Sequence, residues 1–420
     1  MTTTTTTTTT SARTATETLL EGPVTLRREG PADPLRQMPR ESFDDHLLRV
    51  GPRPGVSAAL LADVERAGLL GHGGAFVPVG LKWRTALLRK GSLTLVANAA
   101  ESEPVAGKDG TLLRQRPHLV LDGLRIAAQA LGADRAVLWL HGDDHTGRAA
   151  ALEAFDERGW SDRGVPVEIV SSPVHYLSGE AQAITRAMEG GPALPFLRRA
   201  VTDPWAPQTL VQNVETLARL ALLARGLPNP ATRLLTVLGD QRTVVEVPTS
   251  TTFEQVLIDL GWRTAPEAVL LGGYGGMWAP WDDVWKLPVE ETGLRAQRLT
   301  LGAGVMVPLM AETCGIALTA DLVAYLASMS ARQCGPCAFG LPAIAEHWAR
   351  LADGVSDRRT LDRLAADIST VEGRGACRHP DGATRLSASA LRTFSDHVGA
   401  HAAGMRCLRH TTVTLPGASR

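Results

Sequence analysis

The sequence of 420 residues is poor in cysteine and in aromatic side chains, and it has no excess of charge of either sign. Its five Cys residues are few and odd in number, so a disulfide framework is a poor explanation. In a reducing compartment they are typical of metal ligands or buried apolar groups. Lys and Arg number 43 against 44 Asp and Glu. No basic field is therefore available for nucleic acid or an anionic membrane surface, and we expect no nucleic-acid partner.

Long apolar runs are also missing. No window reaches the roughly 18 uninterrupted apolar residues that a helix needs to span a bilayer. The first residues are a run of Thr, without the basic start and apolar stretch of a secretory signal. We expect a cytoplasmic protein with no membrane span of its own, for which any membrane association comes through a partner.

Patterning divides the chain into four parts. Residues 1–45 lack apolar periodicity, which predicts a disordered arm. Over residues 46–231, apolar runs alternate with helical patterns, which indicates a mostly parallel sheet with covering helices. Residues 232–311 carry short β-branched segments and a glycine turn, typical of a small α+β domain. Residues 312–420 contain amphipathic helical patterns joined by loops that hold most of the cysteines.

A glycine-rich segment, GHGGAFVPVGLKW, occupies residues 71–83. Backbone N–H groups of such a loop can converge on a phosphate, and Lys82 adds a positive charge, although the pattern alone is equally typical of an ordinary turn. The next predicted strand, SLTLVANAA, runs into ESEPVAGKD. Ligands of open α/β sheets lie beyond the carboxyl ends of strands, so Asn98, Glu101 and Ser102 are expected to face the same crevice.

Two further segments point to that crevice. YLSGEAQAI, which begins at Tyr176, places a Gly–Glu pair at a strand-to-helix junction. LVQNVETLARL places Gln212 and Asn213 at the start of a helix. Each segment alone is typical of a helix cap. Amides nevertheless suit a flavin, because the edge of its ring alternates hydrogen-bond donors and acceptors.

The cysteines suggest a metal site with more than one possible identity. Cys334 and Cys337 form a CGPC motif, and Cys377 follows later in the chain. The motif fits a redox dithiol, half of a zinc site or iron–sulfur ligands. A thioredoxin-like dithiol is disfavoured because a predicted helix, not a strand, precedes the motif. Zinc would need two more ligands, which His379 and His410 could supply.

In this order, the segments resemble the NADH-oxidising flavoprotein subunit of respiratory complex I and its relatives in hydrogenases and formate dehydrogenases. The resemblance covers roughly residues 55–405. The family motifs GRGGAGFPTGxKW, NADESEPG, YxCGEE and VNNVET correspond here to GHGGAFVPVGLKW, NAAESEPV, YLSGEA and VQNVET. Four matches in one order are far more specific than any one of them.

The resemblance implies a Rossmann-like FMN domain, then a ubiquitin-like β-grasp domain of the soluble-ligand-binding type, then a helical bundle with a [4Fe–4S] cluster. It implies Glu101 and Glu180 as catalytic residues. Its implied cluster ligands are Cys334, Cys337 and Cys377. Its implied FMN-binding residues are Gly71, Gly73, Gly74, Lys82, Asn98, Glu101, Ser102, Tyr176, Gly179, Glu180, Gln212 and Asn213.

The nicotinamide part of the family pattern is not retained. The family stacks NADH on phenylalanines, and the matching positions hold Val77, Thr85 and, by a looser alignment, Val201. Each lost ring removes stacking worth around 1 kcal/mol. A loop glycine of the family is Phe76, which either replaces the lost stacking surface or fills the space that NADH would use. Two acidic residues of the family motifs are replaced by Ala100 and Ala181.

The cluster motif departs from the family as well. Its CxxCxxC becomes AxxCxxC, with Ala331 at the first ligand position. Three thiolates remain where four are usual, so the fourth iron carries water or another side chain, or is lost. The candidate substitutes are Cys407, His379, Asp381 and Cys314.

The resemblance implies an oxidoreductase subunit like NADH dehydrogenase (quinone). In it, NADH or NADPH delivers hydride to FMN, which passes single electrons to the cluster and on to a ferredoxin-like or other redox subunit. The alternative is an electron-transfer or assembly subunit that has lost nicotinamide oxidation and exchanges electrons with a ferredoxin or a membrane redox protein. A third interpretation is a non-redox binding protein that uses the ubiquitin-like domain.

Overall fold

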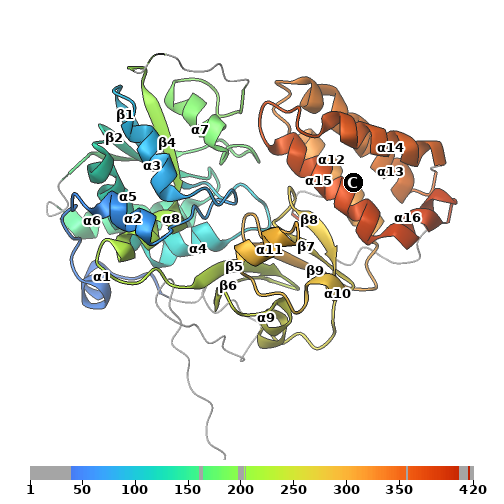
Figure 1. The fold of residues 1–420 in the computed structure, drawn as a ribbon, viewed down its shortest axis with the longest axis horizontal. Helices are drawn as coiled ribbons and strands as arrows, with labels where there is room; N and C mark the ends of the chain where they lie inside the picture. Colours follow the sequence, from blue (N-terminus) through green and yellow to red (C-terminus); the bar gives the residue numbers. More distant parts are fainter. Residues whose placement is uncertain are drawn as a thin grey trace, which may run out of the picture.

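The computed structural model describes residues 39–159, 164–196, 203, 205–355, 358–405 and 415–416. Within them, an α/β part, a second sheet and a group of helices follow one another along the chain (Figure 1). Residues 1–38 of the predicted arm, Val201, Cys407 and His410 lie outside the described residues.

The first sheet is parallel, with the strand order β3-β2-β1-β4. Its strands are β1 (Leu93–Ala99), β2 (Arg135–Leu140), β3 (Val167–Ser171) and β4 (Gln208–Asn213). The central strands β1 and β2 are almost entirely buried, as expected where helices cover both faces of a sheet. The predicted α/β architecture with a mostly parallel sheet is confirmed.

Helices lie on both faces of this sheet. They are α1 (Phe43–Val50), α2 (Leu60–Arg66), α3 (Val79–Leu87), α4 (Lys108–Gln115), α5 (Pro117–Leu131), α6 (His145–Arg158), α7 (Ala181–Met188) and α8 (Val214–Leu223). Successive residues of a strand point to opposite faces. Leu95 of β1 accordingly packs in the core that contains α5 and α8, whereas Val96 packs with Ile184 of α7.

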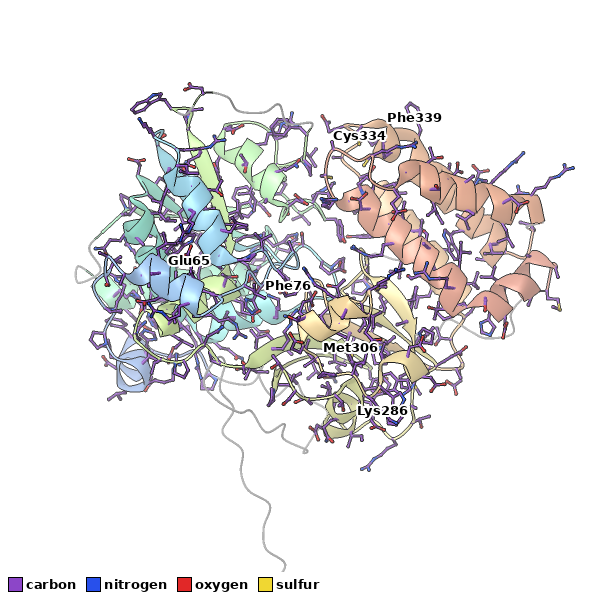
Figure 2. The ribbon with its side chains drawn as sticks, in the orientation of Figure 1. Glu65, Phe76, Lys286, Met306, Cys334 and Phe339 are labelled. Atoms are coloured by element: carbon purple, nitrogen blue, oxygen red, sulfur yellow. The ribbon has the colours of Figure 1, made fainter. Side chains whose placement is uncertain are left out.

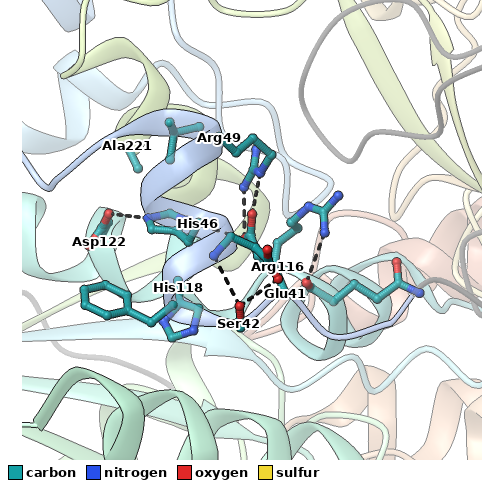
Figure 3. Close-up of polar contacts among 12 residues, drawn as sticks. Glu41, Ser42, His46, Arg49, Arg116, His118, Asp122 and Ala221 are labelled. Atoms are coloured by element: carbon teal, nitrogen blue, oxygen red, sulfur yellow. Dashed lines mark hydrogen bonds and ion pairs between the residues drawn. The ribbon is translucent and has the colours of Figure 1, made fainter.

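Polar contacts fasten α1 to the α/β part, and Figure 3 shows them. His46 Nε2 lies 2.9 Å from Asp122 Oδ2 on α5, and Glu41 pairs with Arg49. Glu41, His46 and Asp122 are all buried. Residues 39–45 are therefore structured, although the sequence placed them in a disordered arm, because buried ion pairs rather than apolar periodicity hold this segment.

The second sheet is mixed, with the order β6-β5-β9-β7-β8. Its strands are β5 (Thr232–Leu238), β6 (Arg242–Pro248), β7 (Ala268–Leu271), β8 (Met277–Pro280) and β9 (Val305–Leu309). The helices between them are α9 (Phe253–Asp259), α10 (Trp281–Val284) and α11 (Glu291–Ala296). Strand β5 runs parallel to β9, and the other pairs are antiparallel.

The C-terminal part is helical. It contains α12 (Gly315–Ser328), the π-helix η2 (Pro336–Gly340), α13 (Leu341–Ala352), α14 (Arg358–Val371), α15 (His379–Thr393) and α16 (Ser395–Ala402). Its core includes Leu322 and Trp348 and continues into Trp278 of β8, so these helices and the second sheet share one apolar interior. Of the described helices, none has the length and apolar character needed to cross a membrane.

Candidate functional site

A cavity of about 880 Å³ lies where the α/β part, the second sheet and the helical part meet. Every FMN-binding residue implied by the sequence lines it, with the exception of Glu101. The segments around Lys82, Asn98, Glu180 and Asn213, far apart in the sequence, therefore share one cavity.

Strand register brings two of these segments together. Asn98 and Asn213 are partners at the carboxyl ends of the adjacent strands β1 and β4. The Asn213 side chain accepts a hydrogen bond from Glu215 N and so begins α8, and Glu180 caps α7 by accepting one from Gln182 N. Asn98 Nδ2 donates to Gly179 O over 2.9 Å. The cap residues that the sequence identified thus also form the cavity wall.

The cavity offers groups that fit a flavin and its phosphate. Lys82 lies on α3, directly after the glycine loop, and burial lowers the pKa of its ammonium. Gln212 is 2% exposed, and its Nε2 has no hydrogen-bond partner among the described residues although the side chain lines the cavity. A buried amide donor without a partner costs about 1–3 kcal/mol. A bound ring with an acceptor edge would remove that cost.

Glu101 does not line the cavity. Its carboxylate accepts hydrogen bonds from Asp109 N and Gly110 N in the first turn of α4, where helix N–H groups have no partner within the helix. Burial, reinforced by the charge of Asp109, raises the pKa of Glu101 to about 7. Glu101 can therefore act on the cavity only through the position of α4.

Glu103 occupies the place at the cavity that we expected for Glu101. Its Oε2 accepts hydrogen bonds from Tyr176 OH over 3.1 Å and from Tyr274 N over 3.0 Å. Burial raises the pKa of Glu103 to about 7. The sequence alone did not single out Glu103, although the second Glu of the ESEP motif was its signal.

An ion network lies beneath the glycine loop. Lys108 Nζ lies 2.6 Å from Asp109 Oδ1 and 3.0 Å from Glu215 Oε2, and Arg219 pairs with the same Glu215. Asn213 Nδ2 donates to Asp109 Oδ2 over 2.7 Å. Because every charge in this network has a partner, it holds the end of β4 and the start of α4 in fixed positions.

The second sheet and α15 supply walls that the sequence did not identify. Gly74 of the loop approaches Gly302 so closely that a Cβ on Gly74 would lie 3.3 Å from Gly302 C. Gly275 meets Gly382 of α15 in the same way, with 3.1 Å from the Gly382 Cβ position to Gly275 Cα. In the sequence, only the glycine runs LGGYGG and LGAG pointed to these close backbone contacts. The additional charged residues that line the cavity are Arg295, Arg298, Arg378, Asp381 and Arg385.

Phe76 stands in the loop at a family glycine position and is 5% exposed. Its φ of 53° lies in the left-handed region, at a cost on the order of 1–3 kcal/mol for such a residue. The guanidinium of Arg233 lies 4.4 Å from the ring centroid and that of Arg295 lies 5.1 Å from it. Of the positions that match the family's phenylalanines, Val77 lines the cavity, whereas Thr85 is exposed on α3 outside it.

The three cysteines of the predicted cluster site lie close together. Burial, and then the neighbouring Cys334 and Cys377, raise the pKa of Cys337 to about 12. Burial likewise raises the pKa of Cys377 to about 11, with a contribution from Glu180 at the cavity. The nearby backbone N–H groups of Arg332 and His379 act in the opposite direction and lower the pKa of Cys337 and Cys377, respectively.

The three thiols fit an iron–sulfur cluster better than a single metal ion. Among the described residues, no group of three or more His, Cys, Asp and Glu side chains is arranged around one metal ion. An iron–sulfur core is larger and spreads its thiolates more widely. N–H groups that point at the sulfurs are a feature that tunes such clusters.

The structure also tests the four substitutes for the missing thiolate. Cys314 Sγ lies 3.7 Å from His401 Nε2, at the opposite end of α12 from Ala331. Fourteen helical residues separate these ends by about 21 Å. His379 Nε2 is bonded to a backbone carbonyl of α12, and Asp381 binds Gly373 N and a neighbouring arginine. Cys407 lies outside the described residues.

Comparisons with known proteins agree with this arrangement. Residues 64–222 match the Nuo51 FMN-binding domain, and residues 317–401 match the NADH-ubiquinone oxidoreductase-F iron-sulfur binding region. The chain is 27% identical to an NADH-quinone oxidoreductase subunit of Rhizobium meliloti, over 83% of this chain and 89% of the relative. The chain belongs to the family of the flavoprotein subunit of NADH-quinone oxidoreductase.

Other members of this flavoprotein family occur in hydrogenases. The chain is 26% identical to NADP-reducing hydrogenase subunit HndC of Solidesulfovibrio fructosivorans, over 89% of this chain and 84% of the relative. A crystal structure of NAD+-reducing [NiFe]-hydrogenase in the H2-reduced state matches with a TM-score of 0.75 at 25% identity. That match covers 89% of this chain and 66% of the hydrogenase chain. The chain is thus a divergent oxidoreductase of this family, whose cofactors are FMN and an iron–sulfur cluster.

Proposed function

We propose that this chain is an electron-transfer subunit that passes electrons from a two-electron donor, through FMN, to a [4Fe–4S] cluster and on to a redox partner. The observation that carries the proposal is the shared cavity of Lys82, Asn98, Glu180 and Asn213, with Glu180 close enough to Cys377 to raise its pKa. A flavin in the cavity would then lie next to the cluster cysteines.

Each implied residue has a task that its position supports. The N–H groups of the glycine loop and Lys82 hold the phosphate, and Gln212 with the two asparagines of the strand ends orients the ring. FMN supplies the ability to divide an electron pair into single electrons. Cys334, Cys337 and Cys377 hold the cluster.

Glu180 and Glu101 have different proposed roles. Glu180 is the catalytic residue of this chain, because it lines the cavity and burial raises the pKa of its carboxyl, so that it can hold a proton there. Glu101 is a positioning residue that acts through α4.

The domain limits implied by the sequence form part of the proposal. An FMN domain occupies residues 46–231, a β-grasp domain residues 232–311 and a cluster-binding helical bundle residues 312–420. The mixed sheet with α9 packed against it supports the second assignment.

The names of the relatives support a proposal for the donor and acceptor classes. Their names include NADP-reducing and NAD+-reducing hydrogenases and NADH-quinone oxidoreductases. We infer NADH or NADPH as the donor and another redox subunit, such as a ferredoxin-like protein, as the acceptor. The chain would work in the cytoplasm and meet a membrane only through that partner.

A second candidate function is electron transfer or assembly without nicotinamide oxidation, with a ferredoxin or a membrane redox protein as partner. The burial of Phe76 and the absence of aromatic side chains at Val77 and Thr85 favour it.

Both candidate functions require FMN and an iron–sulfur cluster, and the cofactor content of anaerobically isolated protein tests this requirement. We expect one FMN and about four iron atoms per chain, the content of one [4Fe–4S] cluster. Adding NADH should bleach the flavin absorbance rapidly under the first candidate and slowly under the second. A colourless, iron-free protein after reconstitution would contradict both.

A further inference from the structure

The Phe76 side chain is enclosed by charges at the rim of the cavity. Figure 2 labels Phe76 where the α/β part meets the second sheet. Two arginines from the second-sheet part of the chain contact the ring, Arg233 at 4.4 Å and Arg295 at 5.1 Å from its centroid. The buried Glu291 connects these arginines, with its carboxylate 3.0 Å from Arg295 Nε and 3.5 Å from Arg233. The ring therefore belongs to a clamp of four side chains.

The backbone holds the ring in this clamp. Phe76 has a left-handed φ of 53°, which an L residue keeps only where its surroundings enforce it. Arg295 also donates a hydrogen bond to Ala75 O over 3.1 Å, so the same arginine binds the main chain beside the ring. The preceding Gly74 is packed against Gly302. The loop is thus fastened to the second-sheet part of the chain at three successive residues.

An enclosed ring is a poor platform for a substrate. A nicotinamide could stack on Phe76 only after displacing a guanidinium that is itself held by Glu291, and the ring is 5% exposed. The adjacent Val77 lines the cavity but offers no aromatic face. In this chain the aromatic side chain stands one residue before the position that it has in the family motif, and its ring forms part of the cavity wall.

We propose that Phe76 is a specificity-determining residue that closes part of the cavity wall and slows reduction of the flavin by nicotinamide donors. This inference rests on the flavin-binding part of the proposed function, which both candidates share. Small reductants that need no stacking surface are not affected, because the loop and Lys82 still bind the flavin.

The first test transfers the phenyl ring from position 76 to position 77. In the double variant Phe76→Gly with Val77→Phe, the loop regains the residue order of the family. Flavin-loaded wild type and variant are mixed anaerobically with NADH or with dithionite, and flavin bleaching is followed by stopped-flow absorbance. We expect the ratio of the NADH rate to the dithionite rate to rise about twofold to tenfold, the value of one aromatic stacking contact.

A second variant leaves the loop sequence intact. Arg295→Gln removes one guanidinium from the ring and should raise the same ratio by a smaller factor. The matched control is Arg392→Gln, an exposed arginine on α15, which should leave the ratio unchanged. FMN affinity and flavin midpoint potential are measured for every variant, so that changes in binding or driving force are recognised.

Two results would overturn the inference. If the flavoprotein shows the same or a lower ratio in both variants, Phe76 is a platform or a bystander, and the proposed function stands. If the wild-type chain binds no flavin, the proposed function fails and this inference fails with it.

Discussion

At the scale of single residues, Lys82 is the positive charge of the proposed phosphate site. It follows the glycine loop, lines the cavity and reaches within 3.4 Å of Val211 O, while burial lowers the pKa of its ammonium. A charged group that burial has partly stripped of water binds an anion more strongly than an exposed one does. We propose the phosphate of FMN as the anion that Lys82 binds.

We predict that Lys82→Gln weakens FMN binding about tenfold to hundredfold, the value of one charge-assisted hydrogen bond. Quenching of FMN fluorescence on titration measures the dissociation constant. Lys286→Gln changes an exposed lysine that does not line the cavity and lies well apart from Phe76 in Figure 2; this control should bind FMN like the wild type. Equal affinities of the two variants would remove Lys82 from the phosphate site.

Ala331 gives a second prediction at this scale. Replacing it with Cys restores the fourth thiolate of the family motif, so the cluster should resist loss of one iron during mild oxidation. The electron paramagnetic resonance signal of a [3Fe–4S] species should be strong in the oxidised wild type and weak in Ala331→Cys. Ser328→Cys adds a thiol on the exposed end of α12 and should behave like the wild type. A weak signal in the wild type as well would indicate a fourth ligand from elsewhere.

Asp122 joins four helices at the scale of secondary-structure elements. It is 1% exposed on α5, and its carboxylate contacts His46 of α1, Arg158 of α6 and Arg225, just beyond α8. Burial would raise its pKa, but the hydrogen bond with His46 and the charges of the two arginines lower it below the ordinary value of 3.8. The Asp122 carboxylate is thus a buried contact on which the position of α1 depends.

We predict that Asp122→Asn lowers the free energy of unfolding by about 3–5 kcal/mol, because it leaves buried arginines without their counter-charge. Urea unfolding followed by circular dichroism measures the change. Asp63→Asn, whose exposed ion pair is worth little, is the control.

The same variant should show a pH dependence of known sign. A carboxyl with a lowered pKa in the folded state stabilises the protein above its ordinary pKa and loses that contribution as the pH falls. The difference in stability between wild type and Asp122→Asn should therefore be constant near neutrality and shrink below a pH of about 3.8. A difference that grows in acid would contradict the assigned ion pairs.

Glycine contacts set the arrangement of the whole molecule around the cavity. Gly382 places α15 against Gly275 of the second-sheet part, and a Cβ there would lie 3.1 Å from Gly275 Cα. Gly399 in α16 has open space around its Cβ position. The two glycines are both helical, so they differ mainly in what they contact.

We predict opposite effects of alanine at these positions. Gly399→Ala should raise the free energy of unfolding by about 0.5–1 kcal/mol through helix propensity. Gly382→Ala should not raise the free energy of unfolding, because the new Cβ crowds Gly275. It should also weaken FMN binding, because α15 must shift away from the cavity. Thermal unfolding and FMN titration of the two variants check both. Tighter FMN binding in Gly382→Ala would show that the contact is not needed.

Much of the site was readable from short segments. The parallel sheet followed from alternating strand and helix patterns, and the shared cavity from the rule that ligands lie beyond the carboxyl ends of parallel strands. Asn213 and Glu180 were recognisable as helix caps because capping depends on residues two or three positions away. These features need only local sequence or a general property of parallel sheets, so the sequence by itself determined them.

Three-dimensional contacts decided the rest. The choice between Glu101 and Glu103 depended on where α4 begins, because its free N–H groups draw the Glu101 carboxylate away from the cavity. Phe76 became a wall rather than a platform only because Arg233 and Arg295 arrive from a part of the chain far along the sequence. No local pattern encodes how such segments pack, and only the tertiary structure brings them together.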